Sequence, residues 1–389
     1  MADVEAMSPD ISEVRMAVRD LCSRFPVDYW LEHDRKALYP ADFIAAFAAA
    51  GWLGTIIPEE HGGLGLGLTE AAVMLQEVAA SGAAMSGASA IHGCVFPPGP
   101  IIHHASPRLK AAYLPRLASG ELTMAFGVTE PDAGLDTSRI TTRAVKDGDR
   151  WVISGKKVWI SNAQHAQKIL LLVRTSPREE SHPLRGMTLF FTDLDRSKCT
   201  LREIEKLGRA AIDSNELFID GLEATDEDIV GEVGAGFRCL LDGINPERVV
   251  VGMEAIGIGR RAVAMAAQYA KDRVVFDRPI GANQAVAHPL AMSWIQLEAA
   301  ELMALRAAAA YDRGEECGPE ANAAKFLGAD AGFTACDRAM QTHGGYAYAK
   351  EYHIERLWRE SRLLRLVPVS QEMVLNHVAT KVLGLPKSY

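Results

Sequence analysis

Paired cysteines are missing from this sequence. Its cysteines are scattered along 389 residues, and none lies in a CxxC spacing: Cys22, Cys94, Cys199, Cys239, Cys317 and Cys336. A chain of this length can bury a core large enough to be stable without disulfide bonds. The cysteines are therefore interpreted as reduced thiols, and a cytoplasmic location is expected.

An excess of positive charge is also missing. The chain has 41 Lys and Arg against 50 Asp and Glu, which leaves a formal net charge of −9. No overall basic field therefore draws the protein to nucleic acid or to an anionic membrane. An anionic ligand has to be held by a local group of residues instead.

Several sequence motifs that indicate a metal site, a hydrolase or a nucleotide-binding loop are absent or incomplete. The histidines, including His103 and His104, show no metal-ligand spacing, so no metal site is expected. No serine lies in a GxSxG elbow, which argues against a serine hydrolase. The glycine-rich stretches 62–67 and 231–236 resemble nucleotide loops, but the first lacks the strand and helix of a Rossmann fingerprint. The second opens a predicted helix and is interpreted as a turn.

Neither a leader peptide nor a membrane span is indicated. Residues 1–5 are acidic and lack the basic start and apolar run of a secretory or transit peptide. Residues 78–107 contain no Asp, Glu, Lys or Arg, but Pro97, Pro98 and Pro100 interrupt them. A spanning helix needs ~20 predominantly apolar residues. We therefore expect a buried helix followed by a proline-rich break.

What the chain does have is a change in the spacing of its apolar residues along its length. Residues 11–119 show apolar side chains at helical spacing. From 122 to about 230, short β-rich runs alternate with turns, and helical spacing returns after Gly234. This order predicts an α+β multidomain protein. Its domains are an N-terminal α-helical domain (1–121), a middle antiparallel β-barrel or sandwich domain (122–232) and a C-terminal α-helical bundle (233–389).

The strands of the middle segment follow one another without helices between them. They are expected at 139–145, 151–154, 157–161, 169–175 and 187–192, with a hairpin turn at 147–149. Consecutive short strands favour an antiparallel sandwich or barrel over a parallel sheet. No low-complexity linker separates the three segments, so ligand sites are expected where they meet.

Several motifs, in matching order along nearly the whole chain, resemble the acyl-CoA dehydrogenase family. They are MAFGVTEPDAG (124–134), KKVWISN (156–162), RVVF (273–276), QTHGG (341–345) and the helix that carries Arg359. The order of the family's domains, helical, then β-barrel, then helical, matches the order of helical and strand-like segments described above. The resemblance implies an FAD-dependent enzyme that forms a trans-2-enoyl-CoA and passes electrons to an electron-transfer flavoprotein.

The resemblance assigns the first two motifs to the flavin ring. An isoalloxazine ring has apolar faces and a polar edge, so its site needs aromatic walls and a few hydrogen-bond donors. Phe126, Val128 and Thr129 would lie along that edge. Trp159 would flank the ring, and Ser161 would donate a hydrogen bond toward flavin N5. Considered alone, Trp159 would be ordinary packing in a β core.

The rest of the cofactor would be held by a neighbouring subunit, which implies a homodimer or homotetramer. The family positions that provide this grip match Arg273, Phe276, Gln284, Gln341, Gly344 and Gly345. An arginine can hold a phosphate through two hydrogen bonds, and glycines let the backbone approach a ligand closely. Without the family pattern, a surface ion pair would be the ordinary role of Arg273.

The base that removes the α proton is not where medium-chain members keep it. Their glutamate lies on the penultimate loop, where this chain has Pro368, which cannot accept a proton. Isovaleryl-CoA and long-chain members place the glutamate on an earlier helix before an arginine, as in Asn245-Pro246-Glu247-Arg248. Glu247 is therefore the predicted base, with Arg248 facing CoA or a neighbouring helix. The alternative is an ordinary helix start, with Asn245 as N-cap and Glu247 in the first turn.

Other positions depart from the family pattern. Leu135 replaces a usual serine, and Glu372 stands where a glutamine often helps to hold the partner subunit's FAD. Ser370 stands where a threonine does and is kept as a cofactor-binding candidate. His92 matches a position that lines the acyl pocket in medium-chain members. It indicates a short or polar acyl group, or else a satisfied core histidine.

Two other functions are open from the sequence alone. Relatives of this fold include flavin oxidases and monooxygenases that react with O₂, and a flavin-binding scaffold without turnover is a further alternative. The candidate base Glu247 favours the dehydrogenase over the scaffold. Acyl chain length, branching and pathway are not determined, because one fold supports several chemistries.

Overall fold

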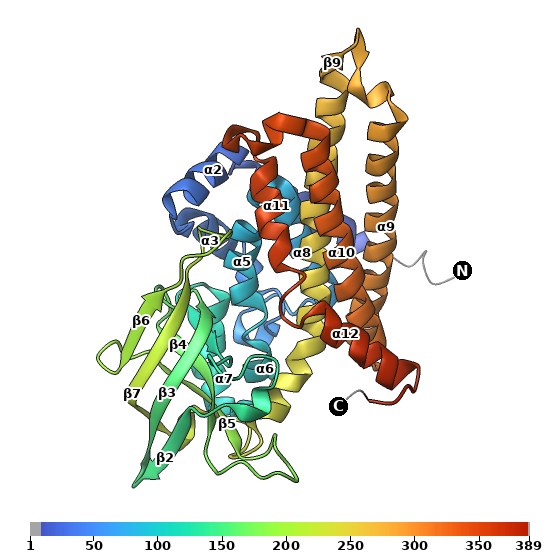
Figure 1. The fold of residues 1–389 in the computed structure, drawn as a ribbon. Coiled ribbons are helices and arrows are strands. Elements are labelled where there is room, and N and C mark those ends of the chain that lie inside the picture. Colours follow the sequence, from blue (N-terminus) through green and yellow to red (C-terminus); the bar gives the residue numbers. More distant parts are fainter. Residues whose placement is uncertain (1–8, 388–389) are drawn as a thin grey trace.

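The computed structural model describes residues 9–387. Figure 1 shows a β-sheet beside a bundle of long helices, with the N-terminal helices packed between and above them. The N-terminal segment forms α1 (Pro9–Ser23), α2 (Val27–Lys36), α3 (Ala41–Ala49), α4 (Leu68–Val78), α5 (Ala84–Val95), α6 (Gly99–His104) and α7 (Pro107–Ala118). Helix α5, followed by Pro97 and Pro98, confirms the expected buried helix and break.

The middle segment forms one eight-stranded sheet. Its strands are β1 (Met124–Gly127), β2 (Arg143–Asp147), β3 (Arg150–Ser161), β4 (Lys168–Arg174), β5 (Met187–Asp193), β6 (Cys199–Glu203), β7 (Ser214–Thr225) and β8 (Ile229–Val230). The order is β6-β7-β3-β2-β4-β5-β8, and β1 pairs with β4. Most neighbours are antiparallel, as expected, but β1 and β2 both run parallel to β4. The sequence pattern did not indicate these parallel pairs.

Two strand predictions need correction. The runs 151–154 and 157–161 belong to a single strand, β3, because Gly155 lets the backbone pass where a Cβ would lie 2.5 Å from Oγ1 of Thr142. The strand expected from 139 begins only at Arg143, because residues 137–139 form a 3₁₀ turn. Asp136 holds that turn by accepting a hydrogen bond from the Ser138 hydroxyl. The hairpin turn at 147–149 is confirmed, with Gly148 at φ +62° between β2 and β3.

The C-terminal segment is a helical bundle. Its elements are α8 (Gly236–Asp272), the hairpin strands β9 (Val274–Val275) and β10 (Arg278–Pro279), α9 (Gln284–Asp312), α10 (Gly318–His343), α11 (Ile354–Leu363) and α12 (Gln371–His377). The expected breaks near 277–281 and 314–319 are confirmed. Helix α8 begins at Gly236, which sits so tightly on β5 that a Cβ would lie 2.4 Å from the backbone nitrogen of Leu189. The alternative interpretation of Asn245 as an N-cap is therefore wrong, because α8 continues through Pro246.

Small residues bring the long helices close together. A Cβ on Gly328 of α10 would lie 2.5 Å from the carbonyl oxygen of Gly252 on α8. One apolar core then joins the bundle to the N-terminal helices, with Leu75 and Ile256 fully buried in it. All six cysteines are free thiols in the part of the chain that the structure describes. Within residues 9–387, no helix is long and apolar enough to cross a membrane.

Candidate active site

The structure brings together the residues predicted to lie along a flavin edge. They come from β1, the segment after it, and β3: Phe126, Val128, Thr129, Trp159 and Ser161. The backbone N–H of Val158 donates to the carbonyl oxygen of Thr129 at 2.9 Å. This bond joins the segment after β1 to β3, the strand that carries Trp159.

A β-bulge sets the direction of Trp159. The register of β3 on β7 shifts between Lys157 and Ile160, and Trp159 has φ +63°. Bulges re-aim side chains next to functional sites, and a positive φ is costly for a bulky residue. Trp159 is 59% exposed, so the alternative of ordinary β-core packing is wrong. Its exposed ring is available to cover a flat ligand.

A buried ion pair holds the segment after β1 in place. Nζ of Lys157 donates to Oε1 of Glu130 at 2.9 Å and to the carbonyl oxygen of Val128 at 2.9 Å. Glu130 also accepts hydrogen bonds from the backbone N–H groups of Thr141 and Thr142. Burial lowers the pKa of Lys157 to about 8, although the Glu130 carboxylate opposes this change. The sequence motif contained Lys157, but its spacing did not indicate this pairing.

Glu247 lies within α8, well after the helix start. It has no hydrogen-bond partner among residues 9–387, and its side chain is partly exposed. Burial by the surrounding protein raises the pKa of the Glu247 carboxyl to about 7, although the nearby His92 opposes this. A helix start would have lowered that pKa, but Glu247 is not in the first turn. A carboxylate with a pKa near the operating pH is suited to act as a general base.

A second carboxylate stands on the same helix face. Glu254 is seven residues from Glu247, which is about two turns of α-helix. Oε1 of Glu254 lies 3.0 Å from Nδ1 of His92 on α5, and Oε2 has no hydrogen-bond partner among the described residues. Burial lowers the pKa of His92, but the Glu254 and Glu247 carboxylates together outweigh it, so that the net change is upward. His92 is thus partnered by a residue that sequence reasoning missed. The sequence feature that could have identified Glu254 is its position as a single acidic residue within the apolar run 249–258.

Aromatic contacts connect His92, the partner of Glu254, to the sheet. The rings of His92 and Phe96 on α5 lie 5.8 Å apart, and those of Phe96 and Phe126 on β1 lie 5.6 Å apart in an edge-to-face arrangement. A continuous line of side chains therefore runs from α8 across α5 to β1. The predicted base and the predicted flavin edge share one interface between the three segments.

Arg209 is another site residue that sequence reasoning missed. It lies in the loop between β6 and β7, and its Nη2 donates to Oγ of Ser161 at 3.0 Å and to Oγ of Ser214 at 2.7 Å. Nη1 lies 3.4 Å from Oγ of Ser89 on α5. No periodicity or motif spacing marks this residue in the sequence. Its position depends on how the loop packs.

Three of the six residues predicted to hold the rest of the cofactor line a separate pocket, whereas Phe276, Gln284 and Gln341 are not among its lining residues. This pocket, about 450 Å³ in volume, is lined by Arg273, Gly344 and Gly345, among others. The Arg273 guanidinium lies 5.7 Å above the ring of Tyr346 and makes no ion pair with the residues in 9–387, so the surface-ion-pair alternative is wrong. Gly344 has φ +59° and open space at its Cβ position. Phe276, at the hairpin between β9 and β10, is 93% exposed.

The two groups lie far apart within one chain. Figure 1 shows the β9 hairpin at the end of α8 remote from the sheet. Glu247 and Arg273 are separated by most of α8, which at about 1.5 Å per residue corresponds to ~39 Å. Gln284 and Gln341 belong to α9 and α10. One dinucleotide cannot contact both groups of the same chain.

The remaining predicted residues have their own local partners. Nη1 of Arg248 donates to Oδ1 of Asn245 at 2.8 Å, and burial lowers the pKa of its guanidinium. Ser370 is the N-cap of α12, where its hydroxyl accepts from the backbone N–H of Met373. Leu135 is 61% exposed, and Pro368 follows a cis peptide bond. These contacts leave the roles of Arg248 and Ser370 toward a ligand as predictions.

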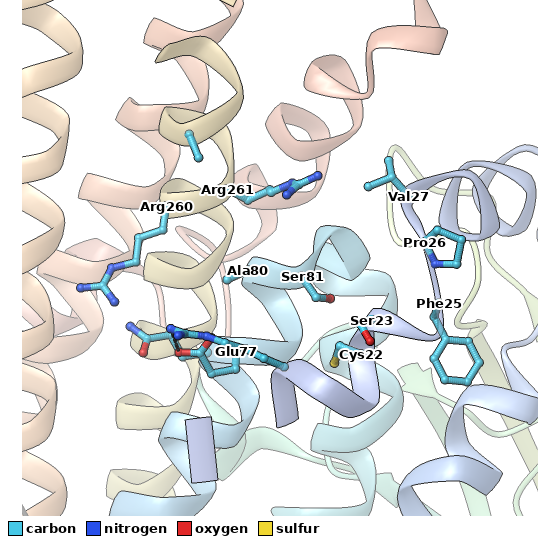
Figure 2. A pocket seen from close by; sticks show the side chains of 13 residues that line it. Cys22, Ser23, Phe25, Pro26, Val27, Glu77, Ala80, Ser81, Arg260 and Arg261 are labelled. Atoms are coloured by element: carbon cyan, nitrogen blue, oxygen red, sulfur yellow. Dashed lines mark hydrogen bonds and ion pairs between the residues drawn. The ribbon is translucent and has the colours of Figure 1, made fainter. Parts of the chain in front are cut away.

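A further hollow lies between α1, α4 and α8. It has a volume of about 560 Å³, and Figure 2 shows Arg260, Arg261 and Glu77 around it. None of the predicted site residues lines it. Two of its charged side chains pair with each other, because Nε of Arg19 lies 2.7 Å from Oε2 of Glu77. We interpret this hollow as a gap in helix packing and not as the active site.

Comparison with known proteins covers nearly the whole chain. Three family models match: the acyl-CoA dehydrogenase N-terminal domain over residues 8–121, its middle domain over 125–222 and its C-terminal domain over 234–383. The acyl-CoA dehydrogenase FadE12 of Mycobacterium tuberculosis is 37% identical over 387 residues, 98% of either chain. A solved glutaryl-coenzyme A dehydrogenase in complex with glutaryl-CoA is 29% identical, with a TM-score of 0.90 and coverage of 98% of this chain and 97% of that one. Butyryl-CoA dehydrogenase from Megasphaera elsdenii is 25% identical with a TM-score of 0.91, over 97% of this chain and 99% of that one.

Proposed function

The chain belongs to the acyl-CoA dehydrogenase family, and we propose that Glu247 is the base with which it converts an acyl-CoA thioester to a trans-2-enoyl-CoA. The enzyme is an oxidoreductase that uses FAD, and the residues present fit this cofactor: Trp159 offers an exposed aromatic face beside Ser161. Bound FAD supplies the acceptor for the hydride that leaves the β carbon. The observation that carries the proposal is the Glu247 carboxyl, which has no hydrogen-bond partner among the described residues. Burial raises the pKa of this carboxyl to about 7.

The residues of the chain have distinct tasks in this reaction. Glu247 accepts the α proton on a carboxylate oxygen that no other described residue occupies. The Lys157–Glu130 pair holds the backbone of Val128, so the predicted flavin edge keeps its shape. Arg209 donates to Oγ of Ser161, so the hydroxyl hydrogen of Ser161 is left to donate elsewhere. That donor suits an acceptor atom on the flavin edge.

A second copy of the chain completes the site in this proposal. The pocket around Arg273, Gly344 and Gly345 lies too far from Glu247 to serve the same cofactor within one chain. An exposed Phe276 and an exposed Trp159 would both be covered when two copies associate. We therefore propose a homodimer or homotetramer in which each FAD contacts two chains.

An electron-transfer flavoprotein is the proposed acceptor of the electrons. The alternative is direct reaction with O₂, as in oxidases and monooxygenases of this fold. Stopped-flow reoxidation separates the two, because an oxidase consumes O₂ rapidly and releases peroxide or a hydroxylated product. A dehydrogenase reoxidises slowly in air and quickly with the electron-transfer flavoprotein.

The experiment that tests the proposal is an anaerobic spectral titration. Purified protein is mixed with a panel of CoA thioesters, and bleaching of the flavin absorption is followed. Bleaching by at least one thioester, with enoyl-CoA as product, supports the proposed function. Retained FAD without bleaching by any thioester would instead identify a flavin-binding scaffold.

A further inference from the structure

The loop before β7 is built to place one guanidinium in the active site. Gly208 packs on α11 so closely that a Cβ would lie 3.2 Å from Cγ of Glu360. Nη1 of Arg359 donates to the carbonyl oxygen of Leu207 at 2.8 Å. Arg209 follows with φ +58°, a conformation that is costly for a residue with a side chain. The surrounding fold therefore determines where the Arg209 side chain lies.

Arg209 has no carboxylate partner in the part of the chain that the structure describes. Its amino groups contact only the hydroxyls of Ser89, Ser161 and Ser214. Its Nε is buried and without a hydrogen-bond partner. Arg209 as a whole is partly exposed, but withdrawing part of a guanidinium from water is unfavourable unless an anion pairs with it. An unpaired cation in this position therefore indicates a missing anionic group.

The nearest carboxylates, Glu360, Asp213 and Glu254, act on Arg209 only at a distance. Glu360 accepts from both the backbone N–H and the hydroxyl of Ser86. Oδ2 of Asp213 accepts from the backbone N–H of Gln164 at 3.2 Å, whereas its Oδ1 has no hydrogen-bond partner among the described residues. Glu254 is paired with His92. Since none of them lies within the 4.0 Å of an ion pair, the charge of Arg209 is not neutralised by direct contact with residues 9–387.

The position of Arg209 relative to the base indicates where such an anion would lie. Ser89, which contacts Arg209, and His92, which lies near Glu247, are three residues apart on α5. That spacing corresponds to a rise of about 4.5 Å, slightly less than one helical turn. Ser161 connects Arg209 to the predicted flavin N5 edge, where the β carbon of a substrate reacts. A group one or two carbons beyond that β carbon would therefore extend toward Arg209.

We propose that the substrate is the CoA thioester of a short dicarboxylic acid, with four or five carbons in its acyl group, whose free carboxylate pairs with Arg209. This inference rests on the proposed function and specifies its substrate. Ser89 and Ser161 orient the guanidinium, and His92 stands beside the path between Glu247 and Arg209. The reaction remains a dehydrogenation: Glu247 takes the α proton, bound FAD would supply the acceptor for the β hydride, and the free carboxylate is retained.

The experiment compares two thioesters of equal carbon number, glutaryl-CoA and pentanoyl-CoA, which differ in the charge at the far end. Binding is measured by perturbation of the flavin spectrum in a Glu247→Gln background, so that turnover does not interfere. The proposal expects glutaryl-CoA to bind at least ~10-fold more tightly. Arg209→Met should weaken glutaryl-CoA by about 30-fold or more, because truncating one partner of a buried charge pair removes most of its contribution. The loss for pentanoyl-CoA should be much smaller than the loss for glutaryl-CoA.

Two further variants keep the test decisive. Arg209→Lys retains the charge and should recover part of the preference for glutaryl-CoA. Arg202→Met is the matched control, because Arg202 is exposed on β6, 3.9 Å from Glu216. If Arg209→Met does not fold, the inference is tested by comparing how tightly the two thioesters bind to the protein with native Arg209.

Two results would overturn the inference. One is equal or tighter binding of pentanoyl-CoA by the protein with native Arg209. The other is an equal loss for both thioesters in Arg209→Met together with a shifted flavin reduction potential, which would make Arg209 a residue that tunes the flavin. The proposed function is tested separately, because flavin bleaching by pentanoyl-CoA supports it even where the preference for an acid is absent.

Discussion

Glu247 and Glu254 stand about two turns apart on α8, but only Glu254 has a hydrogen-bonding partner, Nδ1 of His92 at 3.0 Å. Two carboxylates of one helix are therefore placed in different environments. The Glu254 carboxylate is held by an imidazole, whereas burial leaves Glu247 with a pKa raised to about 7 and no competing partner among residues 9–387. This difference in hydrogen bonding is the reason for proposing Glu247 as the base and Glu254 as a supporting group.

Replacing Glu247 by Gln should abolish most of the reductive half-reaction. The variant keeps the volume of the side chain, so we expect FAD and acyl-CoA binding to be retained. The rate of anaerobic flavin bleaching should fall by about 10²- to 10⁴-fold, the usual contribution of a general base. Glu254→Gln is the matched control and should retain more activity. Normal bleaching in Glu247→Gln would remove Glu247 from this role.

The rate of flavin reduction should depend on pH through Glu247. The base must be deprotonated to accept the α proton, and its pKa in the free enzyme is raised to about 7. The second-order rate constant for reduction should therefore rise as the pH increases through about 7 and level off above it. Stopped-flow reduction between pH 5.5 and 8.5 measures this profile. A rate that falls over that range would contradict the assignment.

Removing the buried Lys157 charge should destabilise the sheet and loosen the predicted flavin edge. Lys157→Met leaves the Glu130 carboxylate buried without its cation, which typically costs ~3–5 kcal/mol. Urea denaturation measures the loss in the free energy of unfolding, and the flavin-to-protein ratio reports on the site. Adding Glu130→Gln to Lys157→Met should recover part of the stability, because the unpaired charge is then gone. Equal stability of the single variant and the natural protein would refute this account.

The pocket around Arg273 should hold FAD without contributing to the fold of its own chain. Arg273 makes no ion pair with residues 9–387, so Arg273→Gln should leave the circular dichroism spectrum and melting temperature of the flavin-free protein unchanged. The bound FAD per chain should decrease on dialysis. Arg278→Gln is the matched control on the same hairpin, since Arg278 is exposed and its side chain donates to Oδ1 of Asn283. If both variants keep FAD equally well, Arg273 does not grip the cofactor.

Local patterns in the sequence were sufficient for the order of elements. Apolar spacing distinguishes the helical segments from the strands, because a helix and a strand expose the same face at different periods. Gly148 marked the β2–β3 turn because it readily adopts a positive φ. The family motifs also led to Glu247, since an acid directly before an arginine can be recognised without knowing its surroundings.

The boundaries of elements and the environment of each site residue were decided by tertiary contacts. Pro246 suggested a helix start, but α8 begins at Gly236, where it packs on β5. The strand β3 continues through Gly155 because Thr142 on the neighbouring segment lies against it. A pattern of neighbouring residues contains no information about such contacts, since the partners are distant in the chain.

By itself, the sequence determined the three-part architecture and led to the proposal of a glutamate as the base. Only the tertiary structure decided that burial raises the pKa of Glu247 to about 7, that Lys157 neutralises Glu130, and that Arg209 reaches Ser161 without a carboxylate partner in the described residues. The physical reason is that desolvation and charge pairing depend on what surrounds a group in space. Helices α5 and α8, the sheet and the loop before β7 come together only when the chain is folded.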